Sequence, residues 1–103
     1  MVRPAIHPGE ILADELQALG LSATAFASEL HVPTNWITQI LKGQRSITAE
    51  TAVRLGQWFD MDPRFWLNVQ MQYELRLAEQ QHGSEIRREV RRRQDQGELV
   101  DVA

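Results

Sequence analysis

The sequence predicts an all-α fold, and three observations lead to that prediction. Apolar residues recur three or four positions apart along most of the 103 residues, which is the spacing of one helix face. Residues that favour helix ends, namely Ser, Thr, Asp-Pro and Gly, separate these stretches. Few stretches alternate β-branched and polar residues as a strand would. We therefore expect a single domain of five helices over residues 1–82, followed by an Arg-rich, helical C-terminal extension over residues 83–103.

The first helix is expected to begin within residues 7–10. Pro8 is tolerated in a first turn, and the Glu10 carboxylate is favourable near the positive end of a helix. Gly20 suits the left-handed residue that often ends a helix. The apolar face between these points consists of Leu12, Leu16 and Leu19.

The second and third helices are expected over residues 22–30 and 33–42. Ser22 is a good N-cap, Pro33 favours a helix start, and Gly43 closes the third helix. The inward residues of the two helices are expected to be Phe26, Ala27, Leu30, Ile37, Ile40 and Leu41. The small Ala27 lets the helices cross closely, so the other face of the third helix projects outward.

Thr48 is expected to cap the fourth helix, and Asp62-Pro63 to open a fifth that runs to about Gln80. The inward residues of the fourth helix are expected to be Ala52, Leu55, Gly56 and Phe59. The fifth helix has two apolar stripes, one made of Trp66, Val69, Tyr73 and Leu77 and the other of Leu67, Met71, Leu75 and Ala78. A helix that is apolar on two sides must be buried on two sides. We expect the second stripe, through Leu67, Met71 and Leu75, to form a homodimer interface; the alternative is a central helix wrapped by its own chain.

The C-terminal extension differs in composition from the rest of the chain. Five Arg and one Glu lie within residues 86–93, where Ile86 and Val90 are the apolar pair at helical spacing. This extension is either a solvated helix or a tail that contacts phosphates or a partner. We expect residues 84–97 to become helical by packing Ile86 and Val90 on the fifth helix of their own or the partner subunit.

Composition excludes several classes of protein. Eleven Lys and Arg against fourteen Asp and Glu give a net charge of −3, so binding to nucleic acid must depend on local charge. The absence of Cys excludes a disulfide scaffold, a thiolate zinc site and a cysteine nucleophile. No run approaches the roughly 18 apolar residues of a membrane span, and the N-terminus does not resemble a secretory signal. We expect a cytoplasmic protein with no membrane partner.

The sequence does not resemble an enzyme. His7, His31 and His82 lack the spacing of metal ligands, and no zinc-protease motif, phosphate-binding loop or nucleophile elbow is present. We expect no catalytic residue, metal or cofactor.

The outward face of the third helix carries the chemistry of a DNA reader. Its expected members are Thr34, Asn35, Thr38 and Gln39. Asn and Gln amides can pair bidentately with adenine in the major groove, and Thr can contact a thymine methyl or a phosphate. The alternative is the polar, solvated face of an ordinary helix.

Residues 21–55, LSATAFASELHVPTNWITQILKGQRSITAETAVRL, resemble the helix-turn-helix of the lambda-repressor-like (XRE) class. HPGEIL at residues 7–12 and RFWLNVQMQYEL at residues 64–75 narrow the resemblance to HigA/VapI-type antitoxins. The resemblance implies a five-helix DNA-binding domain that dimerises and represses its own toxin–antitoxin operon. It also implies neutralisation of a HigB-type mRNA-cleaving toxin. Two-fold pairing of the subunits predicts that the double-stranded operator is an inverted repeat.

The resemblance also assigns residues. It implies that Thr34, Asn35 and Gln39 read base edges, that Thr38 contacts a flanking base or the backbone, and that Ser22 and Arg45 contact the DNA backbone. The chain departs from the family twice. Trp36 stands where Arg is frequent, and we expect it either to cover the core edge or to press on sugars and thymine methyls. His31 stands where Gly is frequent, so the turn is made without a left-handed glycine or with a strained residue.

Two other functions stay open at this point. The chain could be a stand-alone XRE-type transcriptional regulator without a toxin, or a protein-interaction module that no longer binds DNA. A small basic protein encoded directly upstream would favour the antitoxin.

Overall fold

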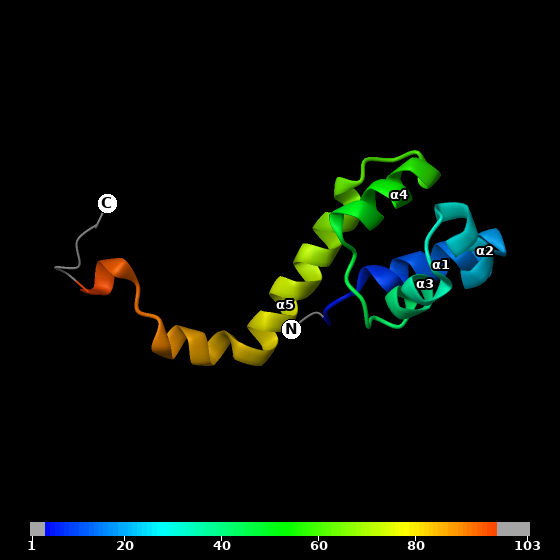
Figure 1. Ribbon diagram of the computed structural model, residues 1–103. Coiled ribbons are helices and arrows are strands. Elements are labelled where there is room, and N and C mark those ends of the chain that lie inside the picture. The colour runs from blue at the N-terminus through cyan, green and yellow to red at the C-terminus, as the bar shows by residue number, and fades with distance from the viewer. Residues whose placement is uncertain (1–3, 97–103) are drawn as a thin grey trace.

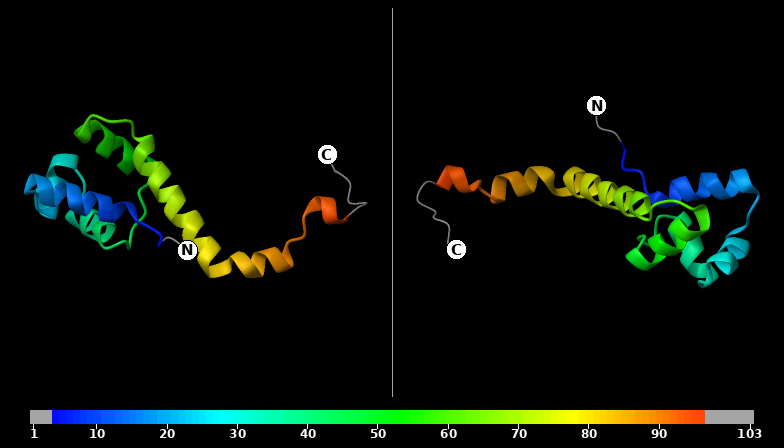
Figure 2. Two further views of the ribbon diagram at one scale, coloured as in Figure 1. Left: turned by 180° about the vertical axis from the view of Figure 1, so that it is seen from behind. Right: turned by 90° about the horizontal axis from the view of Figure 1, so that it is seen from above.

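The computed structural model describes residues 4–96, which contain α-helices and one short 3-10 helix but no strand, and so confirm the all-α prediction. The elements are α1 (Pro8–Leu19), α2 (Ala23–Leu30), α3 (Thr34–Leu41), α4 (Ala49–Phe59), α5 (Arg64–Glu89) and η1 (Arg93–Gln96). The first four helices and the first half of α5 form a head, from which the rest of α5 projects as an arm (Figures 1 and 2). The molecule measures 59 × 34 × 21 Å.

The start of α1 is fixed by a reciprocal pair of hydrogen bonds. His7 Nδ1 accepts from the Gly9 N–H at 2.9 Å, and Glu10 Oε2 accepts from the His7 N–H at 3.0 Å. This capping box satisfies two backbone donors that a helix start leaves free. Gly20 ends the helix in the left-handed conformation, with φ 68°, as predicted.

The caps predicted for the second and fourth helices are confirmed. Ser22 Oγ and Thr48 Oγ1 each accept a hydrogen bond from the backbone N–H three residues later, at 3.0 and 3.3 Å. At α5 the N-cap is Pro63 and not Asp62 as predicted; Asp62 lies one residue earlier, where its Oδ1 accepts from the Arg64 N–H at 2.9 Å. Each helix of the head therefore begins where a short polar or proline-containing signal stands in the sequence.

One core joins all five helices. Its buried apolar side chains are Leu12, Leu16, Phe26, Ala27, Leu30, Ile37, Ile40, Ile47, Ala52, Leu55 and Trp66. The prediction that Leu19 shares the inward face of α1 is wrong, because its side chain lies on the last turn and is 51 % exposed. Trp58, Phe59 and Trp66 meet in edge or tilted contacts with ring centroids 4.9 and 5.8 Å apart, so they pack as core residues.

Two close contacts position the middle of the chain. A Cβ on Gly9 would lie 1.8 Å from the Ile40 carbonyl oxygen, so only glycine permits α1 and α3 to cross this closely. The buried Gln70 of α5 binds the loop between α3 and α4: its Oε1 accepts from the Ile47 N–H at 2.8 Å, and its Nε2 donates to Ser46 Oγ at 3.4 Å.

The prediction that the fifth helix ends near Gln80 is wrong, because α5 is 26 residues long and ends at Glu89. Glycine favours a helix end by lacking a side chain, but here Gly83 is buried beneath Glu79 and Arg87, which form an ion pair across it. The ribbon bends in this second half (Figure 1).

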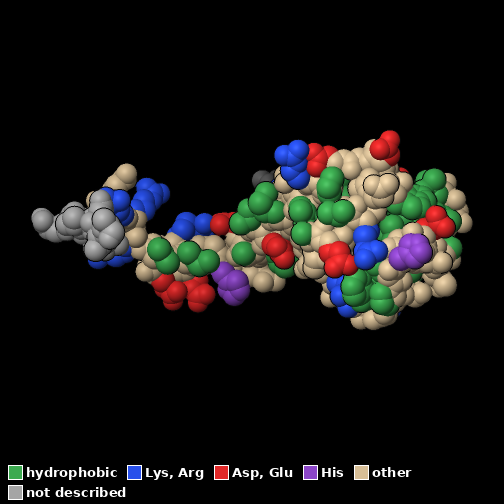
Figure 3. All heavy atoms as spheres, turned by 45° about the horizontal axis from the view of Figure 1, so that its top comes forward, with side chains coloured by type: hydrophobic (Ala, Val, Ile, Leu, Met, Phe, Trp, Pro, Cys, Tyr) green, Lys and Arg blue, Asp and Glu red, His purple; other side chains and the backbone are tan. Residues whose placement is uncertain are grey.

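Ile86 and Val90 were expected to pack on the fifth helix of their own chain or of the partner subunit. In the structure they do not pack on α5 of their own chain. Ile86 lies within α5 and is 47 % exposed, and Val90 directly follows the helix and is 66 % exposed. Basic side chains gather at the far end of the arm (Figure 3). Residues 97–103, which complete the expected extension, lie outside the described residues.

Stability should fall at mildly acidic pH because of His7. The imidazole is 5 % exposed, with its ring 4.8 Å from that of Tyr73, and burial lowers its pKa below the ordinary 6.5 despite the opposing influence of Glu10. Protonation would also replace the Nδ1 acceptor by a donor that faces the Gly9 N–H. Since the pKa of His7 is lower in the folded than in the unfolded chain, neutral His7 stabilises the fold fully above about pH 6.5. This stabilisation is lost as the pH falls from there through the folded pKa.

Urea unfolding at about pH 7.5 and about pH 5 should show the loss of stability that the titration of His7 causes. His7→Asn keeps a capping acceptor without a titrating group, so it should reduce this pH dependence; an unchanged dependence would contradict the assignment.

Gln70→Ala should lower the free energy of unfolding by about 1–3 kcal/mol, because the buried Ile47 N–H loses its acceptor. Gln72→Ala, at an exposed position on the same helix, should change it by less than about 0.5 kcal/mol. Urea titration of both variants measures the difference. Equal, small effects would mean that Gln70 does not hold the loop.

Candidate DNA-binding surface

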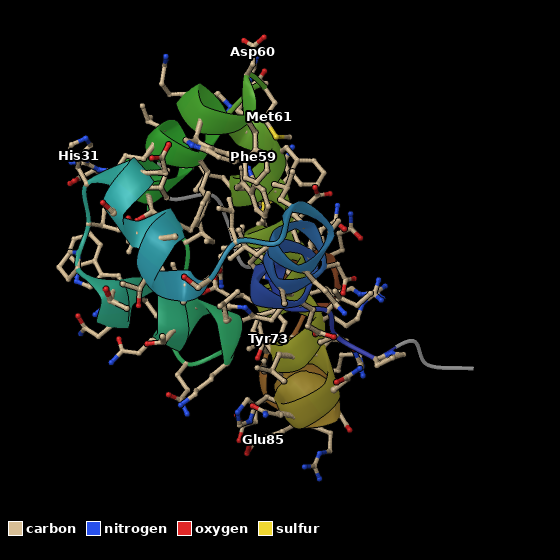
Figure 4. The ribbon with its side chains drawn as sticks, turned by 90° about the vertical axis from the view of Figure 1, so that its right-hand side faces the viewer. His31, Phe59, Asp60, Met61, Tyr73 and Glu85 are labelled. Atoms are coloured by element: carbon tan, nitrogen blue, oxygen red, sulfur yellow. The ribbon has the colours of Figure 1, made fainter. Side chains whose placement is uncertain are left out.

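Helices α2 and α3 form a tight helix-turn-helix. The turn begins at His31, which has φ 59° and ends α2 in the left-handed conformation without being a glycine. The Val32 N–H donates to the Ala27 carbonyl at 3.0 Å, and the Val32 side chain packs against the core. Figure 4 shows His31 at the outer edge of the molecule, where the two helices are joined.

The buried side of α3 determines which residues face outward. Ile37 and Ile40 are both 0 % exposed, and the helix packs on α1 and α2. On the outer side, Thr34 and Asn35 are exposed, and Thr38 and Gln39 are partly exposed. The predicted DNA-reading residues therefore do share one accessible side of α3.

These four residues are not equally free to bind a base. Thr38 Oγ1 donates to the Asn35 carbonyl at 3.2 Å, so its hydroxyl is partly engaged by the helix itself. Gln39 Oε1 accepts from Arg45 Nε at 2.9 Å, which leaves the amide N–H₂ and one lone pair of the oxygen for another partner. Asn35 has an exposed side chain with both an amide donor and an amide acceptor.

Arg45 lies beside the outer side of α3. Its guanidinium carbon is 5.1 Å from the centroid of the Trp36 ring, which is a cation–π contact. The sequence suggested that Trp36 either covers the core edge or contacts DNA, and did not suggest this contact with Arg45. The departure from the family at Trp36 thus places an aromatic ring under a cation.

Ser22 lies at the start of α2, where its Oγ caps the helix by accepting from the Ala25 N–H at 3.0 Å. The residue is exposed, and its hydroxyl proton remains a donor. Together with Arg45, it provides a hydrogen-bond donor of the type that contacts DNA phosphates.

The loop that carries Arg45 is held by Gln70, a residue to which the sequence analysis gave no role. Gln70 binds Ile47, two residues beyond Arg45, and Ser46. A signal for it existed, because Gln70 lies four residues after Trp66 and three before Tyr73, within the first apolar stripe of α5. A polar residue in such a stripe is buried and needs a partner.

Neither a metal site nor a membrane span is found among the residues that the structure describes. Within residues 4–96, no group of three or more His, Cys, Asp or Glu could hold a metal ion. In the same part of the chain, no helix is both long enough and apolar enough to cross a membrane. His7 caps α1, and His82 lies 3.7 Å from the Glu85 carboxylate on the exposed arm.

Comparison with known proteins identifies clear relatives, although no protein-family model matches the chain. The chain is 54 % identical over 78 residues to virulence-associated protein I of Dichelobacter nodosus, and this match covers 75 % of the chain and 72 % of that protein.

Solved structures are similar over most of their length. The structure of an addiction module antidote protein of a HigA family from Coxiella burnetii has a TM-score of 0.85 and 48 % identity, covering 87 % of this chain and 99 % of that one. The Pseudomonas aeruginosa antitoxin HigA, solved with the higBA promoter, has a TM-score of 0.82 and 41 % identity. That match covers 84 % of this chain and 96 % of the relative.

Proposed function

This chain belongs to the HigA/VapI antitoxins, a family of lambda-repressor-like helix-turn-helix transcription regulators, and we propose that it binds its operator and represses its own toxin–antitoxin operon as a dimer. The proposal also includes neutralisation of a HigB-type toxin. The family comprises antitoxins and transcription regulators rather than enzymes.

The outward polar side of α3 carries the proposal. A helix whose other side is buried on α1 and α2 can enter the major groove only with its outer side chains toward the bases. The relative solved with promoter DNA supports this use of the fold. In our assignment Thr34, Asn35, Thr38 and Gln39 approach base edges, whereas Ser22 and Arg45 bind phosphates.

The exposed stripe of α5 supports a two-fold dimer. Met71 and Leu75 are 50 % and 64 % exposed, one helical turn apart on the side of α5 that faces away from the core, and Leu67 lies at the core edge. Covering such side chains in water is favourable in proportion to the apolar area removed. A two-fold dimer would place the two copies of α3 about 34 Å apart, one turn of DNA, and would require an inverted-repeat operator.

The toxin partner is supported by family membership and by charge. The net charge of −3 complements a small basic protein. The test is to co-express the chain with a basic protein encoded directly upstream, and to measure both co-purification and suppression of mRNA cleavage. A chain that binds its operator but has no such neighbour would be a stand-alone regulator.

Asn35→Ala should weaken binding to the operator by about 1–3 kcal/mol and relax sequence preference at one position of each half-site, because a bidentate base contact is lost. Titration of the DNA upstream of the gene and of single-base variants measures both effects. Lys42→Ala, at the exposed C-cap of α3, is the control for general charge: it should weaken all sequences alike. No effect of Asn35→Ala on any sequence would contradict base reading, and absence of DNA binding by the unmodified protein would indicate an interaction module.

Leu75→Glu should dissociate the dimer, raising its dissociation constant about tenfold or more, because a charge would be buried in an apolar interface. Sedimentation velocity at micromolar concentration measures the monomer fraction. Val53→Glu places the same charge at a 59 % exposed apolar position on α4 and should leave the dimer intact. The reverse pattern would move the interface from α5 to α4.

A further inference from the structure

Three side chains on the outer surface of the helix-turn-helix form one connected group. Arg45 Nε donates to Gln39 Oε1 at 2.9 Å, and the same guanidinium lies over the Trp36 ring at 5.1 Å from its centroid. Trp36 and Gln39 lie on α3, one turn apart, whereas Arg45 belongs to the following loop. We call these residues the Arg45 clamp.

The two contacts constrain different degrees of freedom of the guanidinium. A planar cation on a ring face is fixed in height and tilt, but it can still rotate in its own plane. The hydrogen bond from Nε to Gln39 removes that rotation. One edge of the fork is then used inside the protein, and the four N–H groups on the two terminal nitrogens remain to bind an anion.

The backbone under Arg45 is held as well. Gln70 binds the Ile47 N–H at 2.8 Å and Ser46 Oγ at 3.4 Å, so the loop is connected to α5 directly after Arg45. All three clamp residues are partly rather than fully exposed. A long cationic side chain is thus pre-ordered at the edge of the surface that faces DNA in our proposal, and pre-ordering lowers the entropy lost on binding.

We infer that Trp36 and Gln39 are positioning residues that hold the Arg45 guanidinium for a bidentate contact with a DNA phosphate, an inference that rests on the proposed function. Arg forms paired, parallel hydrogen bonds to phosphate oxygens, which a point charge cannot do. While it holds Arg45, the Gln39 oxygen keeps only one lone pair for another donor. Its amide N–H₂ can still donate to a base.

The experiment compares matched variants at Trp36. Trp36→Phe keeps an aromatic face, whereas Trp36→Leu keeps apolar bulk without one. Binding is titrated on the DNA directly upstream of the gene and on a random-sequence duplex of equal length, over a range of salt concentrations. Trp36→Leu should lose about two- to fivefold in affinity for both duplexes, and Trp36→Phe should lose clearly less. Circular dichroism melting curves check that each variant is folded, and should Trp36→Leu be unfolded, the Gln39 variant provides the test.

Gln39→Met keeps the length of the side chain but removes the strong acceptor. It should lose about three- to tenfold in affinity on both duplexes, with a further loss on the operator alone where the amide N–H₂ meets a base. It should also reduce the salt slope toward that of Arg45→Ala, which is lower by about one ion per subunit. A merely structural residue would weaken binding without changing the slope. In the Arg45→Ala background, Gln39→Met should have little further effect, because the group it positions is already absent.

The outcomes separate this inference from the proposed function. If Arg45→Ala reduces affinity but Trp36→Leu and Gln39→Met leave the salt slope unchanged, or add fully to Arg45→Ala, the clamp is wrong and DNA binding stands. If Gln39→Met acts at one base pair alone, Gln39 is a base reader and not a positioning residue. If the unmodified protein binds neither duplex, the proposed function itself fails.

Discussion

The placement of α3 depends on two isoleucines, because a helix of eight residues is too short to be stable by itself in water. Ile37 and Ile40 are fully buried, and their burial determines which side of the helix meets solvent. Gly9 then allows α1 to contact the backbone of Ile40, which leaves α3 little room to slide. A short helix held in this way presents its outer side chains in one orientation, as contacts inside a DNA groove require.

Helix α5 links the surface that we assign to DNA with the one that we assign to the partner subunit. On its inner side, Gln70 holds the loop that carries Arg45, and Tyr73 packs against the capping histidine of α1. On its outer side, Met71 and Leu75 lie exposed. One helix therefore bears both sets of side chains, the inner ones that hold the DNA-facing loop and the outer ones that we assign to the partner subunit.

The sequence predicted most of the head because its signals are local. A capping side chain acts on a backbone N–H two or three residues away, and a helix face is set by spacings of three and four. The predictions for Leu19 and for the end of the fifth helix were wrong because, at these two places, tertiary surroundings outweigh the local sequence signal. Leu19 has helical spacing but lies beyond the reach of the core, and the cost of a mid-helix Gly83, about 1 kcal/mol, is offset when neighbouring side chains cover it.

The sequence by itself determined that the chain is all-α, where the helices of the head begin, and that Asn35 and its neighbours share the outward side of α3. Periodicity and capping suffice for those conclusions, since they involve residues within one or two turns of each other. Only the tertiary structure decided that Gln70 reaches Ile47, 23 residues earlier, and that Arg45 rests on Trp36 with its Nε bound to Gln39. These contacts join separate elements, and their geometry follows from how the helices pack, about which residue spacing carries no information.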